Sequence, residues 1–182
     1  MRAGLFLDRD GVINVDTGHP HRVDQIEFVP GIFDLVRQAN RLNYFVAVIT
    51  NQAGIAKGLY SVEQFTNLSQ WMKDQFKQND AVIDRIEFCP HHPEGQVIEF
   101  KKLCLCRKPL PGMIRTITES VPIDLTRSAL VGDRITDIQA GFAAGVAHLW
   151  WLRGEVSSDD SMSQETLSCR VSTISRLEQV TL

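Results

Sequence analysis

Two carboxylates separated by one residue follow a short apolar run near the start of the chain. Residues Leu5 to Leu7 have the composition of a buried strand that ends just before Asp8, and Asp10 lies two positions further on. Side chains two apart on extended backbone point the same way, so both carboxylates would face the space beyond one strand end, where open α/β sheets bind ligands. Because such close carboxylates repel each other, a bound cation or a shared proton is expected. An Asp-rich turn is the alternative for this segment taken alone.

Polar side chains also follow two later apolar runs. The run Tyr44–Ile49 leads into Thr50, and another run ends at Asp133, with Asp137 four residues later. Lys108 precedes a predicted helix. Because parallel strands end along one edge of a sheet, these groups can converge with the first carboxylate pair. Carboxylates that hold Mg²⁺, a hydroxyl and an ammonium are the groups that neutralise and orient a phosphate dianion. The set therefore predicts a phosphoryl-transfer site.

The chemistry of such a site gives the first carboxylate pair separate tasks. Asp8 can attack phosphorus to form an aspartyl-phosphate, which divides one difficult step into two. Asp10 can protonate the leaving oxygen and later deprotonate the attacking water. Thr50 and Lys108 can hold the remaining phosphoryl oxygens.

Apolar runs alternate with helical patterns along the 182 residues, which predicts one α/β domain with a mostly parallel sheet and helices on both faces. A capping box at Ser61 to Gln64 opens one helix, and Gly145 ends another. Glu155 to Glu165 is rich in Ser and Asp and is predicted to be a mobile surface loop. We expect strands at 5–7, 44–49, 82–88, 128–132 and 146–152, helices at 30–42, 61–77, 111–120 and 136–144, and a short strand and helix within 169–182.

A second group of residues has the composition of a metal site. Cys89 and His91 form one close pair, Cys104 and Cys106 form another, and a 12-residue loop separates the pairs. Three thiolates and one imidazole suit a closed, tetrahedral, structural zinc site. Buried hydrophobic cysteines or two disulfides are the alternatives, and His92 competes with its neighbour as the fourth ligand.

The composition excludes several classes of protein. The formal net charge of −3 gives no sign of a nucleic-acid or membrane surface. We find no secretory signal and no apolar run approaching the ~20 residues that cross a bilayer. We therefore expect a cytoplasmic protein with reduced cysteines. We also expect a monomer, and the predicted phosphoryl-transfer site implies a small phosphorylated substrate.

Three dispersed motifs between Gly4 and about Leu152 occur in the order found in the haloacid-dehalogenase (HAD) superfamily of phosphohydrolases, which this chain resembles. The resemblance implies a Rossmann-like fold without a large cap domain, with Asp8 as nucleophile and Asp10 as acid/base. It implies Mg²⁺ bound by Asp8, the Asp10 carbonyl and Asp133. Short inserts would surround the entrance, at 15–28, 53–60 and in the zinc loop 89–106.

Four segments, 6–14, 50–58, 89–93 and 104–109, resemble the phosphatases of D-glycero-D-manno-heptose 1,7-bisphosphate. This resemblance implies that His91 takes the fourth zinc position. It also implies further substrate contacts, namely Asp16, Gly18, His19, Asn51, Gln52, Ala53, Arg107 and Arg134.

Two of these expected contacts bear on the choice of substrate. Arg107 has the fork that can grip a second phosphate. His19 departs from the tyrosine expected at that position, which affects sugar recognition. Histidinol-phosphate phosphatases, a sister group with the same aspartates and zinc ligands, are the nearest alternative, and a zinc-stabilised binding module without catalysis is the alternative from another class.

Overall fold

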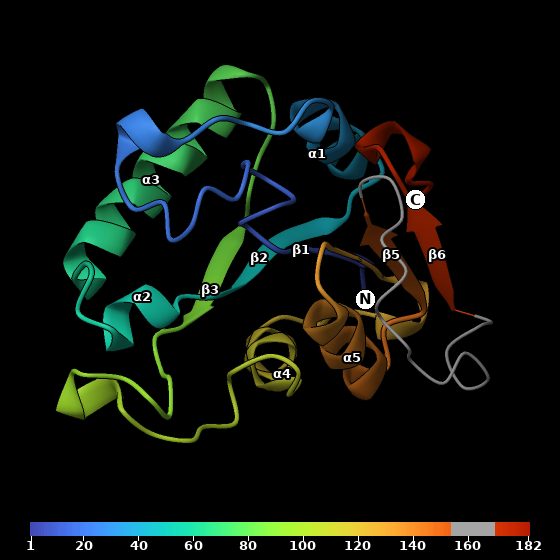
Figure 1. Cartoon of the computed structure of the whole chain (residues 1–182). Coiled ribbons are helices and arrows are strands. Elements are labelled where there is room, and N and C mark those ends of the chain that lie inside the picture. The colour runs from blue at the N-terminus through green and yellow to red at the C-terminus, as the bar shows by residue number, and fades with distance from the viewer. Residues whose placement is uncertain (154–169) are drawn as a thin grey trace.

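The computed structural model describes residues 1–153 and 170–182, and a parallel sheet lies at its centre (Figure 1). The described residues form a six-stranded sheet in the order β3-β2-β1-β4-β5-β6, and every neighbouring pair is parallel. This arrangement confirms the predicted α/β class. The strands are β1 (Gly4–Leu7), β2 (Phe45–Asn51), β3 (Arg85–Cys89), β4 (Ala129–Gly132), β5 (His148–Leu152) and β6 (Val171–Ile174).

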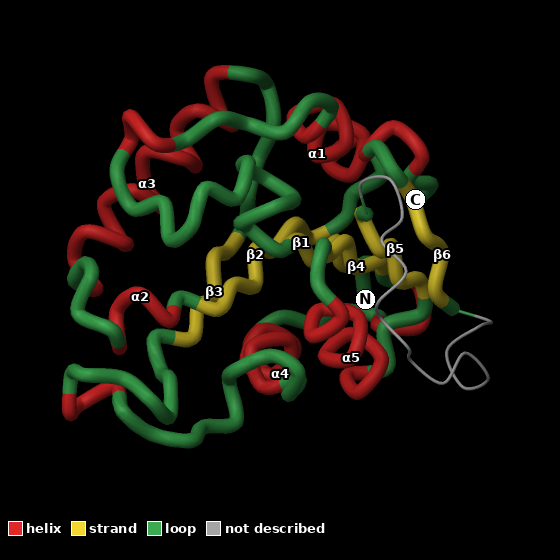
Figure 2. Tube along the Cα trace, viewed as in Figure 1, coloured by secondary structure: helices red, strands yellow, loops and turns green. Residues whose placement is uncertain are grey.

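Helices cover both faces of the sheet (Figure 2). One hydrophobic cluster joins the sheet to α1 and α3, and a second joins its other face to α4 and α5. The helices are α1 (Ile32–Arg41), α2 (Ala53–Ala56), α3 (Val62–Gln78), α4 (Gly112–Ser120) and α5 (Ile135–Ala144).

The central strand β1 shows why the two faces differ. Its side chains alternate, so Leu5 and Leu7 belong to the cluster with α1 and α3, whereas Phe6 belongs to the cluster with α4 and α5. All three are fully buried, as expected for a parallel strand covered on both faces. The apolar run therefore ends where the chain must leave the core, directly before Asp8.

The predicted helix boundaries agree well with the structure. Ser61 caps α3 by accepting a hydrogen bond from the Gln64 backbone N–H, while the Gln64 side chain bonds back to Ser61. Gly145 ends α5 in the left-handed region at φ 90°. Both sequence signals thus act as the capping rules predict.

The segment after β2 differs from its prediction. Thr50 and Asn51 continue the strand beyond its predicted end at Ile49, because β3 pairs with them as far as Cys89. The short helix α2 then forms within the predicted entrance insert at 53–60. Pairing with a neighbouring strand therefore extends β2 beyond its apolar residues.

The end of the chain contains the predicted strand as β6, followed by a single 3₁₀ turn at Leu177–Gln179. The predicted loop at Glu155 to Glu165 and Cys169 lie outside the described residues. None of the described helices combines the length and the apolar character that spanning a bilayer requires.

Candidate active site

Three carboxylates and one ammonium meet at the carboxyl end of the central strands. Oxygen atoms of Asp8, Asp133 and Asp137 lie within 4.8 Å of one another. The Lys108 Nζ lies 2.9 Å from Asp8 Oδ1 and 2.7 Å from Asp137 Oδ1. We call these four residues the acidic floor, because they line the base of a pocket that opens at this edge of the sheet.

Strand order explains how residues so far apart in sequence reach one place. Strands β1 and β4 are neighbours, with Leu7 opposite Val131, so Asp8 and Asp133 emerge side by side. Gly11 permits this approach, since a Cβ there would lie 2.2 Å from the Asp133 carboxylate. Its φ of 92° also favours glycine.

The ammonium of the acidic floor is held by backbone and side-chain contacts. Lys108 donates from Nζ to the Ile49 carbonyl at 2.8 Å and is almost fully buried. The Asn51 amide clamps its backbone, donating to the Lys108 carbonyl at 3.1 Å and accepting from its N–H at 3.0 Å. Asn51 at the end of β2 therefore fixes where the lysine enters the site.

Burial and mutual repulsion shift the protonation of the acidic floor. Burial, followed by the charge of Asp137, raises the pKa of Asp8 to about 8 and that of Asp133 to about 6. Although burial favours the neutral amine, Asp8 and Asp137 outweigh it and raise the pKa of Lys108. Three carboxylates thus face one ammonium, an excess of two negative charges when all are ionised.

A divalent cation fits this charge and this donor set. The Asp133 Oδ1 atom is buried and has no hydrogen-bond partner among the described residues, although the Asp133 backbone carbonyl accepts a bond from Trp151. Mg²⁺ prefers carboxylate and carbonyl oxygens, which this site supplies. The acidic floor is therefore chemically suited to hold Mg²⁺.

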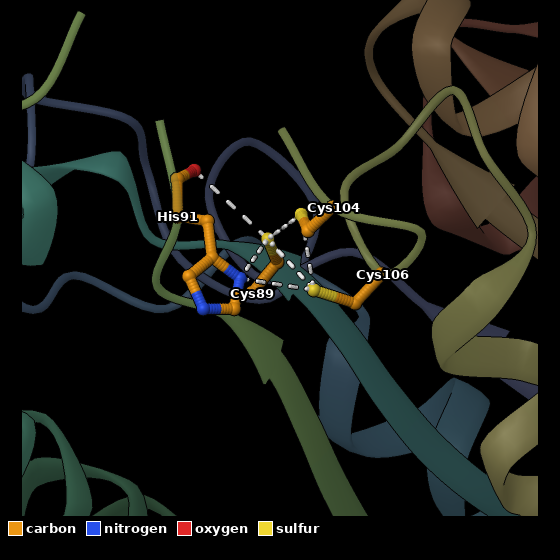
Figure 3. Close-up of side chains that lie close together, drawn as sticks. All are labelled: Cys89, His91, Cys104 and Cys106. Atoms are coloured by element: carbon orange, nitrogen blue, oxygen red, sulfur yellow. Dashed lines mark hydrogen bonds between the residues drawn. The ribbon is translucent and has the colours of Figure 1, made fainter. Parts of the chain in front are cut away.

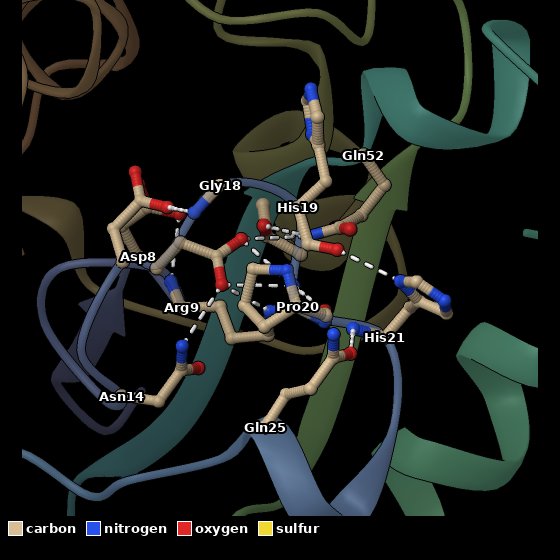
Figure 4. Close-up of polar contacts among 12 residues, drawn as sticks. Asp8, Arg9, Asn14, Gly18, His19, Pro20, His21, Gln25 and Gln52 are labelled. Carbon is tan, nitrogen blue, oxygen red and sulfur yellow. Dashed lines mark hydrogen bonds and ion pairs between the residues drawn. The ribbon is translucent and has the colours of Figure 1, made fainter. Parts of the chain in front are cut away.

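The side chain of Asp10 belongs to a second hydrogen-bond network, whose donors Arg9, Asn14 and Gln52 are labelled in Figure 4. Its carboxylate accepts hydrogen bonds from Arg9, from Asn14 at 3.0 Å and from Gln52 at 3.2 Å. The Gln52 amide also donates to Thr50 Oγ1 at 2.7 Å. Asp10 and Thr50 line the pocket, so this network fixes two predicted catalytic residues at once.

The entrance segment that begins at Val15 supplies one wall of the pocket. Asp16 pairs with Arg134 at 2.7 Å, and His19 Nε2 lies 3.3 Å from Lys57 Nζ. Burial and the Lys57 charge lower the pKa of His19, which is consistent with a neutral imidazole that accepts from the lysine. Seven of the eight predicted substrate contacts line the pocket: Asp16, Gly18, His19, Asn51, Ala53, Arg107 and Arg134.

Gln52 is the predicted substrate contact that the structure does not bring to the pocket. It is 1% exposed, and its amide is occupied by Thr50, Asp10 and the hydroxyl of Tyr60. Six pocket residues were given no site role from the sequence: Lys57, His92, Ile135, Thr136, Asp137 and Trp151. The sequence did place Asp137 near the site, four residues after Asp133, but without a role.

The cysteines and histidine predicted to bind zinc converge beside this pocket (Figure 3). The three sulfur atoms of Cys89, Cys104 and Cys106 lie 3.1–3.4 Å apart, and His91 Nδ1 lies 3.4 Å from Cys106 Sγ. These separations exceed the ~2.05 Å of a disulfide bond. They approach the roughly 3.8 Å between sulfurs that share a tetrahedral Zn²⁺.

Only one of the two adjacent histidines joins this group, which we call the thiolate cluster (Cys89, His91, Cys104 and Cys106). The ring of His92 lines the pocket and accepts a bond from the Glu94 N–H. Arg107 joins the cluster to the pocket, because it lines the pocket and donates to the His91 carbonyl at 3.3 Å. The donor set fits structural zinc, with no position left for a reacting ligand.

Comparison with known proteins agrees with this geometry. The HAD-hydrolase-like family model matches residues 105–171. The D-glycero-beta-D-manno-heptose-1,7-bisphosphate 7-phosphatase of Yersinia pestis is 44% identical over 142 residues, which cover 78% of this chain and 76% of that protein.

Solved structures show the same likeness. A putative HAD-like phosphatase from Mesorhizobium loti aligns with a TM-score of 0.80 and 35% identity, covering 86% of this chain and 75% of that one. The D,D-heptose 1,7-bisphosphate phosphatase of B. bronchiseptica, solved with magnesium and phosphate, aligns with a TM-score of 0.72 and 33% identity over 84% of this chain and 80% of that one. This chain is a phosphatase, and it belongs to the D-glycero-beta-D-manno-heptose-1,7-bisphosphate 7-phosphatase family of HAD-like hydrolases.

Proposed function

We propose that this chain removes the 7-phosphate of D-glycero-β-D-manno-heptose 1,7-bisphosphate, in a Mg²⁺-dependent reaction, to give the heptose 1-phosphate. The observation that carries the proposal is the acidic floor, which places Asp8 beside Lys108 and Asp133 at the base of a pocket with cationic walls. The β anomer follows the names of the relatives.

Each residue of the site has a role in this proposal. Asp8 attacks phosphorus, and Lys108 neutralises charge on the phosphoryl oxygens. Asp10 gives a proton to the sugar oxygen as the P–O bond breaks, and then takes one from the water that hydrolyses the aspartyl-phosphate. Thr50 supplies a further hydrogen bond to the phosphoryl group. When bound by Asp8, Asp133 and the Asp10 carbonyl, Mg²⁺ supplies charge compensation for the transferred phosphoryl group.

The pocket walls support a substrate with a second phosphate. Arg107, Arg134 and Lys57 all line the cavity beyond the acidic floor. A distal phosphate can pair with these cations, and the planar fork of Arg107 suits two phosphate oxygens at once. Histidinol phosphate presents an ammonium at its distal end, which the same side chains would repel.

We further propose that the chain acts as one domain in the cytoplasm. The three thiols of the thiolate cluster stay available for zinc in a reducing compartment. Short inserts at the pocket entrance, instead of a separate cap, would then select the substrate.

The test is phosphate release with Mg²⁺ from both anomers of heptose 1,7-bisphosphate and from histidinol phosphate. We expect kcat/KM for the β-bisphosphate to exceed that for histidinol phosphate by ~100-fold or more, about 2.7 kcal/mol of transition-state binding. Equal or greater kcat/KM for histidinol phosphate would reject the proposed substrate and leave the phosphatase chemistry standing.

A further inference from the structure

Arg9 lies between the two catalytic aspartates in sequence, but its side chain points into the protein. It is 2% exposed, although charged side chains are seldom buried unless they are paired. Its guanidinium carbon lies 5.5 Å from the centroid of the Phe65 ring. Burying a guanidinium in this way is unfavourable unless its contacts compensate for the lost hydration.

The contacts of Arg9 are concentrated on Asp10. The Arg9 Nε donates to Asp10 Oδ1 at 2.9 Å, and Nη2 donates to Oδ2 at the same distance. This two-point contact fixes the plane of the carboxylate as well as its position. Asn14 donates to Oδ1 and Gln52 to Oδ2 from other directions. Asp10 is therefore held by three side chains that only donate to it.

The same guanidinium also reaches the pocket entrance. Arg9 Nη2 donates to the Pro20 carbonyl at 2.8 Å (Figure 4). Pro20 directly follows Gly18 and His19, both of which line the pocket. A single buried side chain thus joins Asp10 to the turn that forms one wall of the pocket.

We propose that Arg9 is a positioning residue that holds Asp10 for proton transfer to the leaving oxygen. This inference rests on the proposed function, because it assigns a partner to the acid/base of that reaction. It concerns the guanidinium, whose contacts to a side-chain carboxylate are all with Asp10. The Arg9 backbone N–H donates to Asp8 Oδ1 at 2.7 Å, a contact that substitution of the side chain leaves in place.

Arg9 contributes during proton transfer, while negative charge develops on the Asp10 carboxylate. As an Asp8 oxygen bonds to phosphorus, the bond from phosphorus to the substrate oxygen breaks, and that oxygen keeps the electron pair. The proton of the Asp10 carboxyl passes to this oxygen and leaves a carboxylate. Arg9, Asn14 and Gln52 are already oriented toward the carboxylate on which the negative charge develops. Donors fixed in advance in this way lower the barrier.

The test compares substrates whose leaving groups differ in their need for a proton. An alkoxide leaving from a sugar bisphosphate or from glycerol 2-phosphate needs protonation, whereas p-nitrophenolate leaves without it. We expect Arg9→Met to lower kcat/KM by ~30-fold or more for the two alkyl phosphates and by less than ~3-fold for p-nitrophenyl phosphate. Equal losses for both classes, a larger loss for the aryl ester, or no loss would overturn the proposal.

The chain provides a matched control for this substitution. Arg22 makes the same two-point contact with Asp24, at 3.0 and 3.1 Å, but on the surface. Arg22→Met should leave the ratio of kcat/KM between alkyl phosphates and p-nitrophenyl phosphate unchanged, because Arg22 does not contact Asp10. Should Arg9→Met fail to fold, Arg9→Lys keeps the stem and the charge and loses the fork. We expect it to lower kcat/KM for alkyl phosphates ~10-fold more than for the aryl ester, and an equal loss for both classes would reject the role of Arg9.

Failure of the proposed substrate would be distinguishable from failure of this inference. Wild-type protein that hydrolysed glycerol 2-phosphate but not heptose bisphosphate would reject the substrate assignment. The comparison between alkyl and aryl esters would then still measure what Arg9 contributes.

Discussion

The acidic floor and the thiolate cluster both gather four side chains from distant segments, but they are built differently. The floor follows the ends of β1 and β4, is mostly buried, and leaves an unpaired Asp133 oxygen next to the pocket. In the thiolate cluster only Cys89 belongs to a strand; its other members lie on loops, and its ligand atoms face one another. One group is rigidly placed and open to a ligand, whereas the other is closed. The comparison indicates that the first performs chemistry and the second holds a loop in place.

Arg107 is where the two groups meet. It follows Cys106 directly in the chain, donates to the His91 carbonyl and lines the pocket. The thiolate cluster should therefore affect substrate binding by positioning the Arg107 guanidinium. None of its own residues needs to contact the reacting phosphate.

The largest effect should come from removing the nucleophile. Asp8→Asn keeps the size of the side chain and removes its nucleophilic oxygen, so we expect kcat to fall by ~1,000-fold or more while the zinc content stays unchanged. Phosphate release and metal analysis would check this. Asp74→Asn on the exposed face of α3 is the control and should behave as wild type. An Asp8→Asn protein with full activity would exclude the nucleophile role.

Breaking the thiolate cluster should act first on stability. Cys104→Ala removes one ligand, and because metal affinity is coupled to folding, we expect zinc to be lost together with ~2 kcal/mol or more of stability. That corresponds to a fall in Tm of roughly 4–8 °C. Leu103→Ala, at a neighbouring exposed position, is the control. Loss of zinc without a fall in Tm would show that the cluster does not stabilise the fold.

Replacing Arg107, where the acidic floor and the thiolate cluster meet, should weaken binding of the second phosphate and spare the phosphate that is hydrolysed. Arg107→Lys keeps the charge and loses the fork, so we expect kcat/KM to fall ~10-fold for the bisphosphate. For a sugar monophosphate the change should be within ~2-fold, because no distal phosphate is present. Steady-state kinetics on both substrates would measure the difference. Equal losses would mean that Arg107 acts through the loop and not through the second phosphate.

The smallest effect concerns the charge of the acidic floor. The pKa of Asp8 is raised to about 8 from its ordinary 3.8, so the folded, metal-free protein keeps a proton that the unfolded chain releases. Stability therefore falls as pH rises through this window. Mg²⁺ competes with that proton, so the increase in Tm on adding Mg²⁺ should be a few degrees larger at pH 8 than at pH 6. Asp8→Asn should weaken this pH dependence and leave the part due to Asp133, whose pKa is raised to about 6. A larger increase at pH 6 in the wild type would contradict the account.

The sequence predicts the placement of residues that follow strands. The proximity of Asp8 and Asp133 could be predicted because each follows an apolar run, and parallel strands end at one edge of a sheet. The convergence of Cys89, Cys104 and Cys106 with a histidine was equally predictable, since the spacing within each pair already limits its geometry. The choice of His91 over His92 came from the family resemblance.

Contacts that depend on side-chain direction could not be predicted in this way. Nothing in the sequence indicates that Gln52 turns inward to Asp10 and Tyr60, or that Arg9 is buried. The pairing of Lys108 with Asp137 depends on how α5 packs against the end of β4. Such contacts arise from tertiary packing, which has no local signature in the sequence.

The identity of the phosphate that leaves is the most direct test of the proposed reaction. Phosphorus NMR of the heptose 1,7-bisphosphate reaction can follow the two phosphates separately. We predict that the signal of the primary 7-phosphate disappears, that inorganic phosphate appears in equal amount, and that the anomeric 1-phosphate signal persists. Loss of the anomeric phosphate, or release of neither, would contradict the proposed function.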